Sequence, residues 1–450
     1  MRKTNKYDYI IIGAGPAGLF SAYVLGKRYN GKKNILLIDK GHCYDKRKCS
    51  LLQSENKCSC SNCSIISGIG GAAFYVPAKL SNYPAGSKLL SFFEDENTCK
   101  NVYSEVQNIF RQLGINTSTQ PDLFCDKEYQ ELMNLANKND IFLKYYFSQE
   151  HSKDNFADFI KQIICELQSY KIEICTDTEI IDIYEQDNFI LTDKNRNKYI
   201  ADKIIVAVGE AGAFWWNNIV KKLNISKRET SIDVGIRIEF QSHIIKNVYS
   251  YHKDPKFIFK APDGSELRSY CTLSNGNVVI CRNGDFRVID GIYCNYDNGI
   301  GAMTLFNRVY PQKDIMEFAS DISNTVRDKC NGKIALGSMD MLLNNVNNCD
   351  ISKNQTLEYT HKIQLNEVIP TQILNNLKYG VLQLSKIIPG IENPTNTVYF
   401  PAIDKMWNEL ILTADFETSI ENLYVVGDAT GIARGIFQSA LMGYYCGTKI

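Results

Sequence analysis

Three glycines near the start of the chain have the spacing of a phosphate-binding turn. They follow an apolar, strand-like run and lead into a helix-like stretch in the pattern G-x-G-x-x-G. In this pattern Gly13 permits a tight turn, Gly15 lets the backbone approach a pyrophosphate, and Gly18 lets the helix lie close to the strand. The helix N-terminus then offers free N–H groups to phosphates, so no Lys or Arg is required. The sequence therefore predicts a dinucleotide site, with Pro16 and Ala17 in the turn.

An acidic residue follows at the distance expected for a ribose contact. A second apolar run, residues 34–38, ends in Asp39, about 20 residues after Gly18, where dinucleotide sites place the acid that binds a ribose. We expect Asp39 to accept hydrogen bonds from the adenosine ribose hydroxyls. We expect Lys40 to lie in the same site.

Two later strand-like runs also end in glycine. Residues 203–208 are closed by Gly209, and residues 422–426 are closed by Gly427 and Asp428. Both resemble strands of flavoproteins of the two-dinucleotide-binding-domain type, in which the late Asp hydrogen-bonds the ribityl chain of FAD. The resemblance implies FAD rather than NAD, because NAD enzymes need neither strand.

A helix is predicted directly after the last of these glycines. Gly435 precedes an apolar stretch that starts at Ile436. The N-terminus of this helix would point at the isoalloxazine ring, and its partial positive charge would stabilise an anionic reduced flavin. Arg434 has two interpretations, since it either adds to that charge or forms a structural ion pair.

Four cysteines form a cluster in the sequence. Cys49, Cys58, Cys60 and Cys63 are spaced C-x8-C-x-C-x2-C. Free or transiently paired thiols are the favoured interpretation, with structural zinc second and an iron–sulfur cluster third, because Cys58-x-Cys60 is tighter than zinc sites prefer. The chain has 15 cysteines and no export signal, which argues against a disulfide framework.

The cysteines are followed by a glycine-rich loop. It contains Gly68, Gly70 and Gly71. Backbone without β-carbons can approach a flat ring or a phosphate closely. We expect the loop to line the flavin ring or the pyrophosphate, and a plain tight loop is the alternative.

Length and charge narrow the class of protein. The 450 residues suit two or three domains, and 50 basic and 50 acidic residues give no net charge. This balance argues against a nucleic-acid partner. The basic N-terminus is followed by only a short apolar run, and no apolar stretch is long enough to cross a membrane. We therefore expect a cytoplasmic protein.

The glycine-ended runs must join one sheet although they are far apart in sequence. This predicts an α/β fold, in which a discontinuous Rossmann-like FAD-binding domain carries an inserted α+β substrate domain with a mixed sheet. Within that insertion, alternation puts Asp233, Arg237 and Glu239 on a polar face, for which water is favoured over substrate. The expected segments are 1–86, 151–225 and 386–450 for the FAD-binding domain, 87–150 for a helical insertion, and 226–385 for the substrate domain.

The motifs together resemble a largely uncharacterised family of FAD-dependent dehydrogenases that is distantly similar to geranylgeranyl reductases. The resemblance rests on the cysteine cluster and on residues 65–74, 268–272, 276–279 and 427–440. The family usually has Ser-Asp-Gly-Lys after the glycine loop, and this chain keeps only Lys79. The resemblance implies an FAD-dependent oxidoreductase whose substrate the sequence does not name.

The expected reaction is hydride transfer between a small organic substrate and flavin N5. The chain has no second G-x-G-x-x-G, so electrons would come from the substrate, from transiently docked NAD(P)H, or from a donor protein. Lys79, Tyr270 and Arg434 are the candidate catalytic residues, since an acid or base is needed beside the substrate. The alternatives are a flavin-dependent monooxygenase, an FAD-binding tRNA-modifying protein and an electron-transfer protein.

Overall fold

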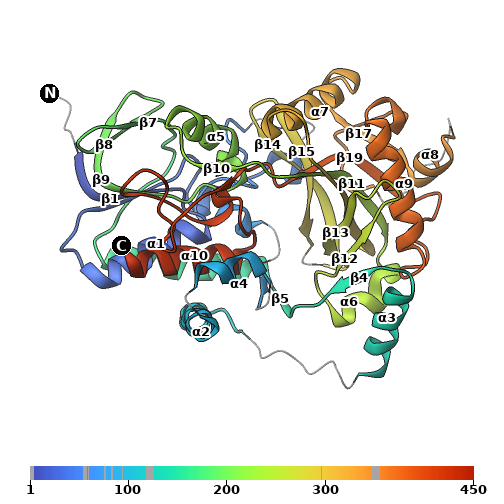
Figure 1. The fold of residues 1–450 in the computed structure, drawn as a ribbon, viewed down its shortest axis with the longest axis horizontal. Helices are drawn as coiled ribbons and strands as arrows, with labels where there is room; N and C mark the ends of the chain where they lie inside the picture. Colours follow the sequence, from blue (N-terminus) through green and yellow to red (C-terminus); the bar gives the residue numbers. More distant parts are fainter. Residues whose placement is uncertain are drawn as a thin grey trace.

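The computed structural model shows an α/β protein built on two large sheets (Figure 1). The residues that it describes are 5–53, 58, 60–75, 78–82, 85–93, 95–117, 126–294, 296–346 and 355–450. Within them, one sheet has seven strands and the other has eight. Of the helices in these ranges, none combines the length and apolar character that crossing a membrane requires.

The first sheet brings the glycine-ended strands together. Its central strands are parallel neighbours: β1 (Asn5–Ile12) pairs with β2 (Ile35–Ile38) and with β9 (Lys198–Val206), and the end of β9 also pairs with β21 (Leu423–Val425). Its outer strands are β6 (Glu173–Cys175) beside β2, and β7 (Ile180–Glu185) and β8 (Phe189–Asp193) beside β9. This confirms the prediction that one sheet contains the four strands that end just before Gly13, Asp39, Gly209 and Gly427.

Helices pack on this sheet and on one another. They are α1 (Pro16–Tyr29), α2 (Glu96–Gln112), α4 (Lys153–Ser169), α5 (Ala213–Lys222) and α10 (Ile436–Lys449). The first and last lie side by side (Figure 1). Gly443 permits this approach, because a Cβ there would lie 2.0 Å from the carbonyl oxygen of Ala17. The helix α4 is amphipathic, and its apolar face is buried.

The second sheet is mixed. Its strands, in spatial order, are β18 (Thr360–Lys362), β17 (Ile334–Ser338), β19 (Thr397–Asp404), β11 (Ile232–Gln241), β16 (Ile300–Val309), β13 (Glu266–Leu273), β12 (Lys256–Lys260) and β4 (Phe142–Lys144). Only the β17–β18 pair of the described strands in this sheet is parallel. Its helices are α3 (Lys127–Lys138), α6 (Lys246–Tyr251), α7 (Ile315–Lys329), α8 (Met339–Asn344) and α9 (Thr371–Leu384).

Three small strand pairs complete the described fold. They are β14 (Gly276–Asn283) with β15 (Phe286–Tyr293), β3 (Ala78–Ser81) with β5 (Ser148–His151), and β10 (Lys227–Arg228) with β20 (Glu409–Leu410). Two strands of the second sheet differ from the expected segments, since β4 lies within 87–150 and β19 within 386–450. Strand pairing depends on partners far away in sequence, so local patterns could not place them.

The charged residues of β11 are buried, and the expectation that they face water was wrong. Asp233 and Arg237 are 0% exposed and Glu239 is 1% exposed. Asp233 accepts a hydrogen bond from Arg308 Nε at 3.1 Å, and Glu239 accepts one from the Tyr399 hydroxyl at 2.5 Å. The physical reason is that β11 is a central strand covered on both faces, where charged groups must be paired.

Candidate functional site

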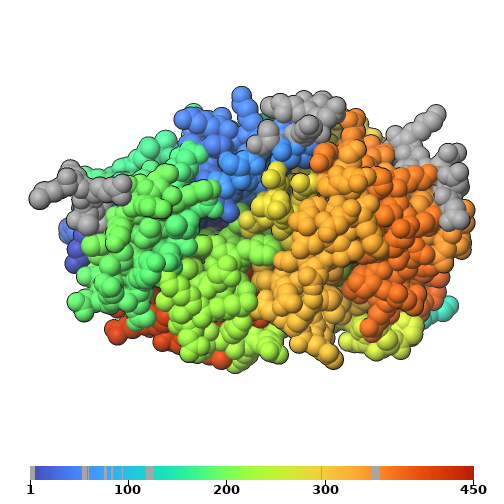
Figure 2. All heavy atoms as spheres, turned by 90° about the horizontal axis from the view of Figure 1, so that it is seen from above, coloured from blue at the N-terminus to red at the C-terminus, as the bar shows by residue number. Residues whose placement is uncertain are grey.

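A cavity of about 310 Å³ lies between the two sheets. Its first wall is formed by the turn before α1, the ends of β2 and β9, the loop after the cysteines and the start of α10. Its second wall is formed by β12, β13 and β16 of the second sheet and by β15 of the small β14–β15 pair. The surface is hollowed where the blue, green and yellow parts of the chain meet (Figure 2). The first wall, which holds the residues expected to bind the cofactor, thus faces the second sheet.

The phosphate turn has the geometry predicted from its glycines. Gly13 has φ +103°, and a Cβ there would lie 2.6 Å from the carbonyl oxygen of Ala207. A Cβ on Gly18 would lie 1.8 Å from the carbonyl oxygen of Gly13. At Gly15, by contrast, the nearest atom would be the Cα of Gly71 at 3.8 Å. The protein itself therefore requires two of the glycines, whereas the third leaves space for a ligand.

The start of α1 can accept an anion. The helix begins at Pro16, and no side chain caps it. The first N–H groups of a helix have no partner within the helix, and together they favour negative charge. Both Pro16 and Ala17 line the cavity, as expected.

The glycine loop after the cysteines packs on this turn. Gly70 N donates to the carbonyl oxygen of Ala14 at 2.8 Å. Gly71 lines the cavity and faces Gly15, and a Cβ on Gly71 would lie 3.0 Å from the Gly15 Cα. Gly68 has φ +105° and lies against the carbonyl oxygen of His42. The loop therefore contributes one glycine to the cavity, and the others shape its backbone.

Arg47, which the sequence analysis missed, fixes that loop from behind. It is 5% exposed and donates to the carbonyl oxygens of Ser64, Ile65 and Ile69. Its guanidinium also lies 4.8 Å from the ring centre of Phe74. One buried cation thus holds several carbonyl groups in place, and no motif in the sequence marks that role.

Asp39 lies at the cavity wall, but its hydrogen bonds differ from those expected. Its Oδ2 accepts from Ala14 N at 2.8 Å, and its Oδ1 accepts from Gly41 N at 2.8 Å and Gly68 N at 2.9 Å. The carboxylate therefore ties three backbone segments together. Oδ1 already accepts two hydrogen bonds, but Oδ2 accepts one and can accept another, so the ribose contact stays a prediction.

Lys40 lies beside this carboxylate, and its ammonium group already donates a hydrogen bond within the protein. Its Nζ donates to the carbonyl oxygen of Ala211 at 2.6 Å. Burial lowers the pKa of Lys40. It lines the cavity at the end of β2.

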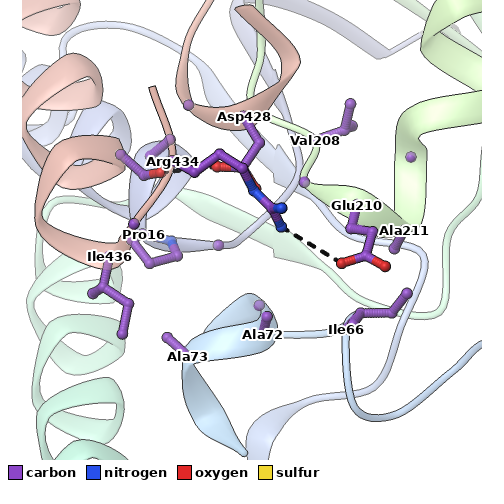
Figure 3. Close-up of a pocket in the computed structure, with 18 of the residues that line it drawn as sticks. Pro16, Ile66, Ala72, Ala73, Val208, Glu210, Ala211, Asp428, Arg434 and Ile436 are labelled. Carbon is purple, nitrogen blue, oxygen red and sulfur yellow. Dashed lines mark hydrogen bonds and ion pairs between the residues drawn. The ribbon is translucent and has the colours of Figure 1, made fainter. Parts of the chain in front are cut away.

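Arg434, Asp428 and Glu210 lie close together at the other end of the first wall (Figure 3), and Asp404 of β19 joins them. Arg434 forms an ion pair with Asp404, and its guanidinium lies 3.4 Å from Asp428 Oδ2 and 3.6 Å from Glu210 Oε2. Burial raises the pKa of Asp428 to about 7 and that of Glu210 to about 7. The sequence analysis missed Glu210, because its importance depends on this contact between distant segments.

The glycines around this cluster have no side chain to fill the edge of the cavity, and two of them have positive φ. Gly427 has φ +73° and Gly435 has φ +116°, and a Cβ on Gly209 would meet no atom within 4 Å. Ile436 starts α10 and lines the cavity. No side chain caps this helix either. The N-termini of α1 and α10 therefore both open into one cavity.

Lys79 and Tyr270, the other two catalytic candidates, also line the cavity. Lys79 Nζ donates to the carbonyl oxygens of Lys253 and Thr272, so it joins the loop after α6 to β13. Burial raises the pKa of Tyr270 far above its usual value, so its hydroxyl stays protonated and can donate a hydrogen bond. Of the two, Tyr270 suits contact with a substrate better.

Beside Tyr270 lies a group that the sequence analysis did not identify. Lys256 of β12 lines the cavity, and burial lowers its pKa to about 8. Asp254 accepts from the Tyr146 hydroxyl at 2.9 Å, and its backbone N donates to His252 Nδ1 at 3.1 Å. Burial lowers the pKa of His252 to about 4, so that ring is neutral. The signal was hidden because single Lys, Asp and His residues form no local motif.

The cysteine cluster does not assemble as a metal site in the part of the chain that the structure describes. There, no three His, Cys, Asp or Glu side chains are placed to hold a metal ion, and the thiols of Cys49, Cys58, Cys60 and Cys63 are unpaired. Burial raises the pKa of Cys49 to about 11 and also raises that of Cys63. The geometry of the described residues therefore gives the zinc and iron–sulfur interpretations no support.

Comparison with known proteins gives limited matches. No family model matches the chain. An uncharacterized protein of Methanosarcina barkeri is 55% identical over 40 residues, which are 9% of this chain and 10% of that protein.

Similar solved structures include NikD, an unusual amino acid oxidase essential for nikkomycin biosynthesis, with TM-score 0.43, 11% identity and coverage of 99% of this chain and 93% of that chain. They also include glycine oxidase from Geobacillus kaustophilus, with TM-score 0.38, 11% identity and the same coverages. Scores of this size establish no shared activity. The fold assignment therefore rests on the strand order and the glycine turn described above.

Proposed function

We propose that this protein is an FAD-dependent oxidoreductase acting on a small organic molecule. The observation that carries the proposal is the convergence of two uncapped helix N-termini, those of α1 and α10, on one cavity that Asp39 borders at one end and Asp428 at the other. A single phosphate would need only one such terminus. A dinucleotide whose ring system lies away from its pyrophosphate uses both.

The residues present fit FAD. Gly15 and Gly71 leave a cradle beside the start of α1 that a β-carbon would enter, which suits a pyrophosphate. Asp39 would bind the adenosine ribose with its remaining acceptor capacity, and Asp428 would accept from the ribityl chain. When bound, FAD would supply the hydride acceptor or donor that the side chains lack.

The chain's own groups then orient the substrate and control its protons. The start of α10 favours negative charge at its end of the cavity. Tyr270 stays protonated and donates a hydrogen bond to an oxygen or nitrogen of the substrate. The strands of the second sheet exclude water from the cavity, which strengthens both interactions.

The test replaces Gly15 with alanine. The added methyl group meets only the Gly71 Cα at 3.8 Å, so we expect the apo-protein to keep its stability. We expect FAD affinity to fall at least about tenfold, which corresponds to about 1.4 kcal/mol. The readouts are the flavin absorbance of the purified protein and the FAD dissociation constant.

Gly18→Ala serves as the contrast. Its Cβ would lie 1.8 Å from a backbone oxygen, so this variant should lose stability as well as FAD. Full FAD content in Gly15→Ala, or a wild-type protein that binds no flavin, would contradict the proposed function.

A further inference from the structure

We propose that Lys256 binds the carboxylate of the substrate, and that the substrate is a small organic acid with an apolar or aromatic body. This inference rests on the proposed function, because it assigns the substrate class of the same cavity. It is argued from the charges, rings and apolar groups that line the second wall.

Most of the cations that line the cavity are already bound to oxygen atoms of the protein. Lys40, Lys79 and Lys144 each donate to an oxygen of the protein, and Arg434 is paired with carboxylates. Within the described residues, the Lys256 ammonium has no hydrogen-bond or ion-pair partner. It carries three donors, and a donor left without a partner in a cavity favours an acceptor on the ligand.

The Lys256 ammonium lies near two aromatic rings. It lies 4.8 Å from the ring centre of Tyr270 and 5.3 Å from that of Tyr146. Ring faces attract a cation but accept no conventional hydrogen bond, so they hold Lys256 in place and leave its N–H groups for another partner. Leu273 and Phe306 also line the cavity, which suits an apolar substrate body.

Other charged residues lie around Lys256. Arg268, Lys144 and Arg434 are close enough to disfavour the protonated form of Lys256, and Asp254 favours it. One oxygen of the Asp254 carboxylate accepts a hydrogen bond from the Tyr146 hydroxyl. Arg268 and Arg434 are themselves paired with carboxylates, so the ammonium of Lys256 is the cation here whose donors remain for an anionic ligand. With a pKa of about 8, Lys256 remains mostly protonated at neutral pH.

The experiment uses FAD-loaded protein with sodium benzoate as the probe and benzamide as its uncharged counterpart. Binding is followed by the shift of the flavin spectrum and by the rise in melting temperature, for wild type, Lys256→Gln and Lys256→Arg. Lys260→Gln is the matched control, because Lys260 is an exposed residue at the far end of β12. The proposal predicts that wild type binds benzoate at least about tenfold more tightly than benzamide, as a charge-assisted hydrogen bond allows.

We expect Lys256→Gln to lose that preference while keeping its affinity for benzamide, Lys256→Arg to restore part of it, and Lys260→Gln to match wild type. Equal benzoate affinity in wild type and Lys256→Gln would overturn the inference. So would a wild type that binds no benzoate, or one that does not distinguish it from benzamide. A protein without flavin would instead contradict the proposed function, and its melting temperature would still report benzoate binding, so the two failures are distinguishable.

Discussion

At the scale of single residues, Arg434 shows how tertiary contacts select among the roles that a sequence leaves open. Its guanidinium is surrounded by Asp404, Asp428 and Glu210, and it lies 5.2 Å from the ring centre of Trp407. This geometry favours the ion-pair interpretation. Asp428 and Glu210, whose pKa values burial raises to about 7, change protonation near neutral pH, so they are the natural place for a test.

The first prediction concerns Asp428→Asn. Because burial raises the folded-state pKa of Asp428 to about 7, the stability that this carboxyl contributes is fully present below about pH 4 and is lost as pH rises through 7. The loss is at most about 4 kcal/mol. We expect apo Asp428→Asn to lose less stability than wild type between about pH 5 and about pH 8, as measured by urea unfolding at both pH values.

The same variant should bind FAD more weakly. Removing a charged acceptor of the ribityl hydroxyls costs about 1.5–3 kcal/mol, or roughly tenfold to a hundredfold in the dissociation constant. Asp187→Asn is the control, since Asp187 is exposed between β7 and β8. Unchanged FAD affinity in Asp428→Asn would contradict the ribityl role.

At the scale of elements, the contact between α1 and α10 decides where both helix N-termini point. The helices approach closely because Gly443 has no side chain, and the Ser21 hydroxyl donates to its carbonyl oxygen at 3.1 Å. The sequence analysis predicted both helices, but it gave no reason for their contact. Their starts are far apart in sequence, and only this packing brings them to one cavity.

The second prediction concerns Gly443→Ala. Alanine normally stabilises a helix by up to about 1 kcal/mol relative to glycine, but here its Cβ would lie 2.0 Å from the Ala17 carbonyl oxygen. Overpacking of this kind costs about 1–3 kcal/mol. We expect a net loss of about 1–2 kcal/mol in the free energy of unfolding, together with weaker FAD binding.

Gly447→Ala is the matched control on the same helix. Its Cβ would lie 3.2 Å from Val24 Cβ and 3.3 Å from the Ser21 carbonyl oxygen, so the overlap is far smaller than at Gly443 and a shift of a few tenths of an ångström relieves it. We expect this change to leave the stability within about 0.5 kcal/mol of wild type. If both variants were equally stable, the close packing of α1 and α10 would not control the site.

At the scale of the whole molecule, the cavity joins the two sheets. The first sheet supplies Asp39 and the two helix starts, and the second supplies Lys256 and Tyr270. A ligand that spans the first wall should therefore stabilise the protein in proportion to how much of that wall it reaches. This separates FAD from smaller flavins.

The third prediction compares FAD with FMN. FAD at about 100 times its dissociation constant should stabilise the apo-protein by about 2.7 kcal/mol. FMN lacks the adenosine half and does not reach the Asp39 end, so it should stabilise less at the same concentration. Thermal melting of the apo-protein with each flavin measures the difference, and equal protection would argue against a site that extends to Asp39.

The sequence by itself determined the features whose cause is local. Apolar runs form strands wherever they occur, and the turn at Gly13 needs a positive φ that glycine adopts at no steric cost, so the glycine-ended strands and the helices after them were predictable. Their membership of one sheet followed from the motif that they share. For the same reason, Gly15 stood out as the position where a ligand would lie.

Only the tertiary structure decided which charges meet and which remain free. Burial of Asp233, the three backbone partners of Asp39 and the carboxylates around Arg434 all depend on segments that are distant in sequence. Lys256 is one lysine among many until its neighbours are known, since its lowered pKa and its place between two rings come from packing. Electrostatic roles depend on distance and desolvation in space, and neither quantity can be read from spacing along the chain.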